Sequence, residues 1–114
     1  MTRILGRLEE IPDGRAKGYP PAGGGFAGLF AVRRGRQVFV YVNACPHAGV
    51  ALDIVPDRFL NHRGTAILCA AHAAFFQVED GFCTAGPCVG DSLEAVPAEV
   101  DAEGFIRVPA EAGA

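Results

Sequence analysis

Two short stretches of the sequence combine cysteine with histidine at spacings that suit metal binding. The first is Cys45-Pro46-His47 and the second is Cys69-Ala70-Ala71-His72, separated by residues 48–68. Each stretch offers one thiolate and one imidazole, and both groups bind zinc and iron. Each follows a short apolar run, so two loops of a β-structure can bring the four side chains together. The candidate metal ligands are therefore Cys45, His47, Cys69 and His72.

The order of these ligands along the chain separates two kinds of metal site. Two cysteines and two histidines can bind tetrahedral zinc, but a zinc finger places its cysteines together and its histidines afterwards. Here each loop carries one residue of each type. That order suits a binuclear iron centre in which the cysteines bind one iron and the histidines the other. A structural zinc-binding module remains the alternative.

The charge of such a centre predicts one-electron chemistry. Two ferric ions and two sulfides sum to a charge of about +2, which two thiolates cancel. With neutral imidazoles the oxidised centre is therefore close to neutral, whereas four thiolates would leave it with a charge of about −2. Adding an electron costs less to a neutral centre, so histidine ligation raises the reduction potential.

The residues around both stretches extend the pattern. CPHAG (residues 45–49) and CAAHAAFF (69–76) resemble the two cluster-binding loops of the Rieske family, and GFCTAGPCVG (81–90) resembles its proline-bearing cover loop. The resemblance spans residues 4–108. It implies an all-β, Rieske-like antiparallel sandwich with a small cluster-binding subdomain at one end. It also implies one Rieske-type [2Fe–2S] cluster, bound by Cys45, His47, Cys69 and His72.

Some positions depart from the family pattern. Ala73 stands where the second motif usually has glycine, so its methyl group will crowd the loop if the backbone there needs a positive φ. Ala74 and Phe76 stand where high-potential respiratory members place serine and tyrosine hydroxyls, which donate hydrogen bonds to sulfur. Neither motif holds a second cysteine for the disulfide of those members. We therefore predict a potential in the lower part of the roughly −150 to +300 mV Rieske range.

Short strands separated by turns must position these loops, because glycine and proline interrupt the chain every few residues. The apolar runs predict strands over 4–10, 26–32, 37–43, 65–69, 75–79, 92–96 and 105–108. Turns are expected at 11–14, 33–36 and 80–81, and a loop at 18–25. The size fits a single domain over residues 1–114, with the cluster-binding subdomain at about 44–90 and a frayed tail at 109–114.

Composition excludes several classes of partner. The net charge is −3 and no polybasic run is present, which argues against nucleic acid binding. No apolar run is long enough for a signal peptide or a membrane helix, so we expect a cytoplasmic protein with no membrane partner. In that compartment Cys83 and Cys88, on either side of Gly86-Pro87, are expected to remain thiols rather than form a disulfide. His62 is expected to be an exposed surface residue.

The resemblance implies an electron carrier rather than an enzyme. An oxygenase of this kind needs a second iron site with two histidines and a carboxylate, but the chain has three histidines and the cluster uses two. We therefore expect no small-molecule substrate. The expected role is a ferredoxin that shuttles single electrons between a reductase and a terminal oxygenase such as a ring-hydroxylating dioxygenase. The small subunit of an assimilatory nitrite reductase is the alternative. Small and apolar loop residues suit transient docking: Ala48, Gly49, Ala73, Ala74 and Pro87.

Overall fold

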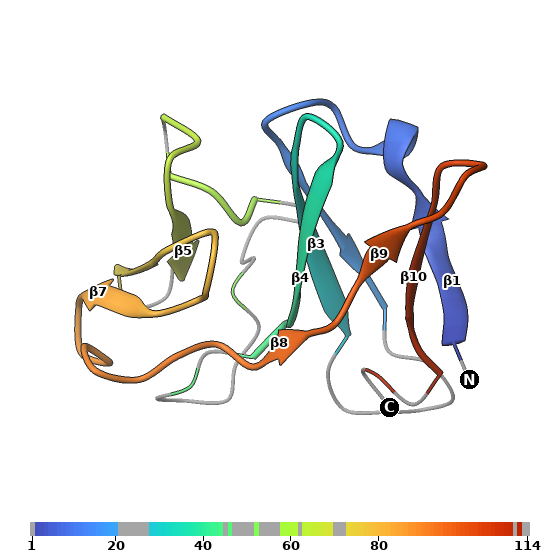
Figure 1. The fold of residues 1–114 in the computed structure, drawn as a ribbon. Coiled ribbons are helices and arrows are strands. Elements are labelled where there is room, and N and C mark those ends of the chain that lie inside the picture. Colours follow the sequence, from blue (N-terminus) through green and yellow to red (C-terminus); the bar gives the residue numbers. More distant parts are fainter. Residues whose placement is uncertain are drawn as a thin grey trace.

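The computed structural model contains three antiparallel sheets. It describes residues 2–20, 28–44, 46, 52, 58–61, 63–69, 73–110 and 112. The sheets follow one another along the molecule (Figure 1). The predicted all-β, antiparallel architecture is therefore confirmed. None of the described residues belongs to a helix with the length and apolar character needed to cross a membrane.

The first sheet joins the two ends of the described chain. It contains β1 (Thr2–Arg7), β10 (Phe105–Pro109) and β9 (Glu99–Val100), in the order β1-β10-β9. The strand predicted over residues 4–10 ends early, because the Glu10 carboxylate accepts the Arg7 N–H and a short 3-10 helix, η1 (Leu8–Glu10), begins there. Pro109, expected to open the frayed tail, instead pairs with Thr2. Residues 111, 113 and 114 of that tail lie outside the described residues.

The central sheet contains β2 (Ala16–Tyr19), β3 (Leu29–Arg34), β4 (Gln37–Val42) and β8 (Ala95–Val96). The predicted hairpin is confirmed, with β3 and β4 pairing from Leu29↔Val42 to Arg34↔Gln37. Its turn is shorter than the expected 33–36, because Arg33 and Arg34 belong to β3, and Gly35 in the turn has a φ of 63°. The loop predicted at 18–25 is wrong at its start, because Gly18 and Tyr19 pair with β3. Its residues 21–25 lie outside the described residues.

Alternate side chains of β3 enter two different hydrophobic cores. Phe30 and Val32 pack with residues of the third sheet and its turns, whereas Leu29 and Ala31 pack with residues of β10 such as Ile106. Side chains of a strand alternate between its two faces. A strand that is buried on both faces therefore has a continuous apolar sequence, as 29–32 does. β3 therefore lies between the two cores and contributes side chains to both.

The third sheet contains β5 (Ile67–Cys69), β6 (Ala74–Phe76) and β7 (Cys83–Ala85), and lies at the opposite end of the molecule from β1 and β10 (Figure 1). β5 and β6 are shorter than predicted. β7 falls within the segment 81–90 that was expected to be a loop. The predicted turn at Asp80-Gly81 is confirmed, with a φ of 75° at Gly81. β9 was not predicted, and the strand expected at 92–96 is reduced to β8 and a single bridge from Ser92 to Phe82.

Candidate metal centre

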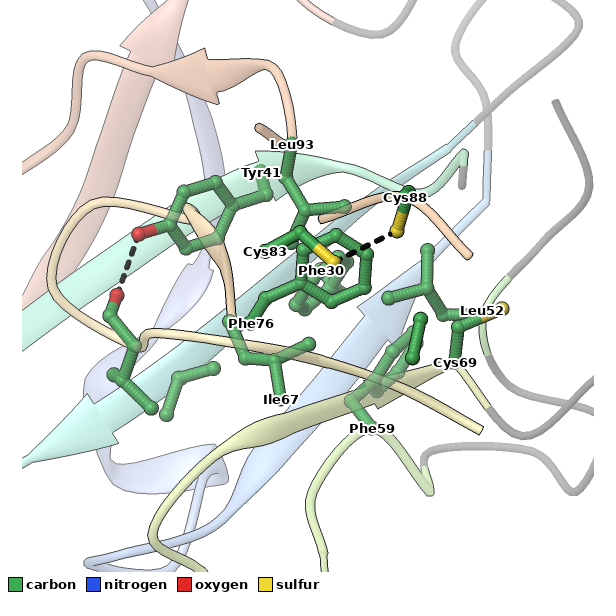
Figure 2. Packing of buried hydrophobic residues seen from close by; sticks show 13 residues of the cluster. Phe30, Tyr41, Leu52, Phe59, Ile67, Cys69, Phe76, Cys83, Cys88 and Leu93 are labelled. Carbon is green, nitrogen blue, oxygen red and sulfur yellow. Dashed lines mark hydrogen bonds between the residues drawn. The ribbon is translucent and has the colours of Figure 1, made fainter. Parts of the chain in front are cut away.

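Of the four candidate ligands, Cys69 lies within the described residues. It is the last residue of β5, is fully buried, and pairs with Ala74 of β6. Figure 2 shows it at one end of the third-sheet core, beside Leu52 and Phe59. Cys45, His47 and His72 lie outside the described residues, as does His62, so their placement stays a prediction.

The backbone on both sides of the first motif is fixed by Asn43. Its N–H donates to the carbonyl of Gly28 at 2.9 Å, which continues the central sheet for one residue beyond β4. Its Oδ1 accepts the N–H of Leu52 at 2.8 Å, and Leu52 is itself fully buried. One side chain therefore ties residue 43 to residue 52, with CPHAG between them. From the sequence Asn43 was expected only to end a strand, because no local signal indicates a bond to a residue nine positions away.

The second motif, taken as residues 69–76, contains a strained residue. Ala73 has a φ of 53°, the one positive φ among the described non-glycine residues. This left-handed conformation costs a residue with a Cβ roughly 1–2 kcal/mol. The position therefore does need a positive φ, which explains why the family pattern has glycine there. The turn from the second motif into β6 forms with alanine at that cost.

Gly86 packs on this strained turn. A Cβ added to Gly86 would lie 2.7 Å from Ala74 Cα and 3.1 Å from the carbonyl oxygen of Ala73, and Gly86 has a φ of 97°. Both the conformation and the contact require glycine. Gly86 therefore lies directly against Ala73 and Ala74. Residues 86–90, the part of the segment 81–90 that follows β7, are called the cover loop from here on. The resemblance implied that this proline-bearing loop covers the cluster, and that stays a prediction. Its close contact with Ala73 and Ala74 was not indicated by any local pattern.

The residues of β6 near Cys69 offer no hydroxyl group. Ala74 and Phe76 are fully buried on one face of the strand, and Phe75 is half-buried on the other. Ala74 was expected on the docking surface, and this is wrong because its side chain belongs to the core. Ala73 and Pro87 are exposed as expected, and Ala48 and Gly49 lie outside the described residues.

Tyr41 connects the central sheet to the turn that follows β6. Its buried hydroxyl donates to the carbonyl of Val78 at 2.5 Å (Figure 2). Burial, assisted by the negative charges of Asp80 and Glu79, raises the pKa of Tyr41 to about 12. The phenol therefore stays protonated near neutral pH and keeps its donor role. This link was not foreseen from the sequence.

Comparison with known proteins gives a consistent match along the chain. The family model described as "Rieske [2Fe-2S] domain" matches residues 5–100. A ferredoxin of carbazole 1,9a-dioxygenase from Nocardioides aromaticivorans IC177 is 26% identical, with a TM-score of 0.75 over 96% of this chain and 98% of that chain. A Sphingomonas yanoikuyae B1 ferredoxin, 22% identical, has the same fold, with a TM-score of 0.75 over 96% of this chain and 98% of that one. No curated protein matches the chain in sequence.

Proposed function

This chain belongs to the Rieske [2Fe–2S] domain family, and on that premise we propose that Cys45, His47, Cys69 and His72 hold its cluster. Family membership confirms the expected cofactor, one Rieske-type [2Fe–2S] cluster. It also confirms the expected class, an electron-transfer protein and not a catalyst. The observation that carries the ligand assignment is the pair of motifs. The second motif begins at Cys69, the buried last residue of β5.

The described residues fit this cofactor. Cys69 lies in apolar surroundings that exclude water, and no charged side chain of the described residues is buried. Asn43 ties the two sides of the first motif together, and the cover loop lies on the second. When bound, the cluster supplies one-electron redox chemistry. The apolar surroundings of Cys69 would keep solvent from that side of the cluster, which also tunes its potential.

We propose a terminal oxygenase of the ring-hydroxylating type as the electron acceptor and a reductase as the donor. Support comes from the carbazole 1,9a-dioxygenase ferredoxin described above, and from a structure titled as a complex of reduced oxygenase and oxidised ferredoxin, 24% identical to this chain with a TM-score of 0.74 over 96% of it and 94% of that chain. The cover loop exposes Pro87 and Val89, the latter 61% exposed. A small, exposed apolar surface suits short-lived docking between redox proteins. We place the protein in the cytoplasm, a proposal supported by the assignment of Cys45 and Cys69 to the cluster rather than to a structural disulfide.

Two ligand substitutions test the assignment. The purified protein is expected to be red-brown, with the low average g-value of a Rieske centre after reduction, whereas a zinc protein would be colourless. Cys45→Ser and His72→Ala should each abolish both signals. His62→Ala is the matched control and should retain them. If the colour survived both ligand substitutions, the four-residue assignment would be wrong.

The choice of acceptor is tested separately by rapid mixing. The reduced protein should be reoxidised by a ring-hydroxylating oxygenase, with one electron transferred for each ferredoxin. Val89→Asp should slow this reaction by placing a charge on the docking surface, and Ala102→Asp, in the exposed turn before β10, is the control. Reoxidation by a sirohaem nitrite reductase alone would favour the alternative acceptor.

A further inference from the structure

Two cysteines outside the cluster motifs lie in direct contact. Cys83 is the first residue of β7 and Cys88 lies in the cover loop. Their Sγ atoms are 2.9 Å apart, and the two residues are 0% and 1% exposed (Figure 2). From the sequence both residues were expected to remain thiols, and this agrees with the structure. Their sulfur atoms nevertheless lie within contact distance of each other.

The backbone fixes this contact on both sides. The N–H of Cys83 donates to the carbonyl of Asp91 at 2.8 Å, and the N–H of Asp91 donates to the carbonyl of Cys88 at 2.9 Å. The left-handed φ of 97° at Gly86 reverses the chain between the two cysteines. Residue 83 and residue 88 are thus held facing each other by the same hydrogen bonds that shape the cover loop.

Among the described residues, neither a metal site nor a strong hydrogen bond holds the two sulfur atoms together. No group of three histidine, cysteine, aspartate or glutamate side chains gathers at metal-binding distances among the described residues, so the pair is not part of a further metal site there. The structure shows the reduced state, in which the Cys83 thiol donates a weak hydrogen bond to the carbonyl of Ala85 at 3.2 Å. A disulfide needs the sulfurs to approach from 2.9 Å to about 2.05 Å.

We propose that Cys83 and Cys88 form a reversible disulfide that fastens the cover loop to β7, with a low-molecular-weight disulfide as the oxidant. One cysteine thiolate attacks a sulfur of the reagent, which forms a mixed disulfide and releases one small thiol. The second cysteine thiolate attacks the protein sulfur of that mixed disulfide and displaces the other small thiol. The two cysteines lose two electrons and two protons, and the reagent gains them as two thiols.

The disulfide acts on a loop that touches the second motif. Gly86, between the two cysteines, packs on Ala73 and Ala74. Reduced, the cover loop is held by backbone hydrogen bonds and packing, and it can open locally. Oxidised, opening of the loop requires the disulfide to break. The oxidation state of Cys83 and Cys88 follows the ratio of small thiols to disulfides in solution, and it therefore determines how readily the cover loop opens.

Asp80 and Asp91 flank the two cysteines, so the oxidation state of Cys83 and Cys88 can be measured by mass spectrometry of a single fragment. The intact cluster-loaded protein is incubated with excess glutathione disulfide, quenched in acid, alkylated under denaturing conditions and cleaved after aspartate and glutamate. The fragment 81–91 contains both cysteines and neither Cys45 nor Cys69. It should lose two hydrogens and take up no alkyl group, and treatment with dithiothreitol before alkylation should restore two alkylation sites. The visible absorption of the cluster should persist throughout.

Substitutions and hydrogen exchange complete the test. Cys88→Ser should leave a fragment that gains either one alkyl group or one glutathione, with no internal link. In wild type, amide exchange at Val89 and Asp91 should be several-fold slower in the oxidised form than in the reduced form, a readout that does not depend on a variant folding. Two alkylated cysteines after oxidation with the cluster intact would overturn the proposal. So would an internal link that appears only after the cluster is lost.

Discussion

Gly86 and Ala74 approach each other so closely that any side chain at position 86 would overlap the backbone of Ala74, at 2.7 Å from its Cα. We predict that Gly86→Ala lowers the free energy of unfolding by about 2–3 kcal/mol, since it adds an overlap to a strained backbone. Gly90→Ala is the matched control, because Gly90 has a φ of 99° with open space around it.

The control should cost only about 1 kcal/mol, the penalty for the backbone alone. Urea unfolding of the two variants measures the difference. Equal losses at the two positions would mean that the cover loop does not press on the second motif in solution.

The strain at Ala73 predicts a stabilising substitution. Ala73→Gly removes the cost of a Cβ in the left-handed region and should raise the free energy of unfolding by about 0.5–1 kcal/mol, after the larger unfolded-state entropy of glycine is subtracted. Ala102→Gly, at an exposed turn position without a positive φ, should lower it slightly. A loss of stability in both variants would contradict the left-handed conformation of Ala73.

The hydroxyl of Tyr41 predicts a loss of stability in alkali. Its pKa is about 12 in the folded protein and 10.0 ordinarily, so the unfolded chain releases this proton first as pH rises. The contribution is complete below pH 10.0 and is lost progressively towards pH 12, by about 3 kcal/mol in total.

Tyr41→Phe lacks this titration and the buried hydrogen bond to Val78. It should be less stable at pH 8 by about 1 kcal/mol and should lose less stability than wild type between pH 9 and 11. Denaturant midpoints across that range measure both effects, with Tyr19→Phe as the control for the other tyrosine. Parallel pH profiles for wild type and Tyr41→Phe would argue against the raised pKa.

The absence of hydroxyl groups at Ala74 and Phe76 predicts the direction of a potential change. Phe76→Tyr adds a donor on the face of β6 that Ala74 shares, and should raise the reduction potential measured by protein-film voltammetry. Phe75→Tyr makes the same chemical change on the opposite face and should leave the potential nearly unchanged. A wild-type midpoint in the upper half of the roughly −150 to +300 mV range would refute the low-potential prediction.

The sequence was informative where a local signal decides the structure. The hairpin of β3 and β4 and the turn at Gly81 both have characteristic residues at fixed spacings. It was uninformative about β2 and β7, which exist because another strand pairs with them. Gly18 and Tyr19 follow a pattern typical of a loop and become a strand only beside β3.

Packing relationships also lay beyond local patterns. The bond from Tyr41 to Val78 joins residues 37 positions apart, and the contact between the two cysteine sulfurs depends on the path of the cover loop. Ala73 shows what a departure from a family motif can reveal. The residue type raised the question of a positive φ, and only the three-dimensional structure answered it.

The position of β3 between two cores has a consequence for how the protein unfolds. Neither the half that contains β10 nor the half that contains β5 can lose its order without exposing one face of the same strand. Unfolding should therefore be a single cooperative event, in which release of iron coincides with melting of the distant strand pair β1 and β10. A destabilising substitution in β1 or β10, far from the cluster, would then shorten the time for which the protein retains its iron.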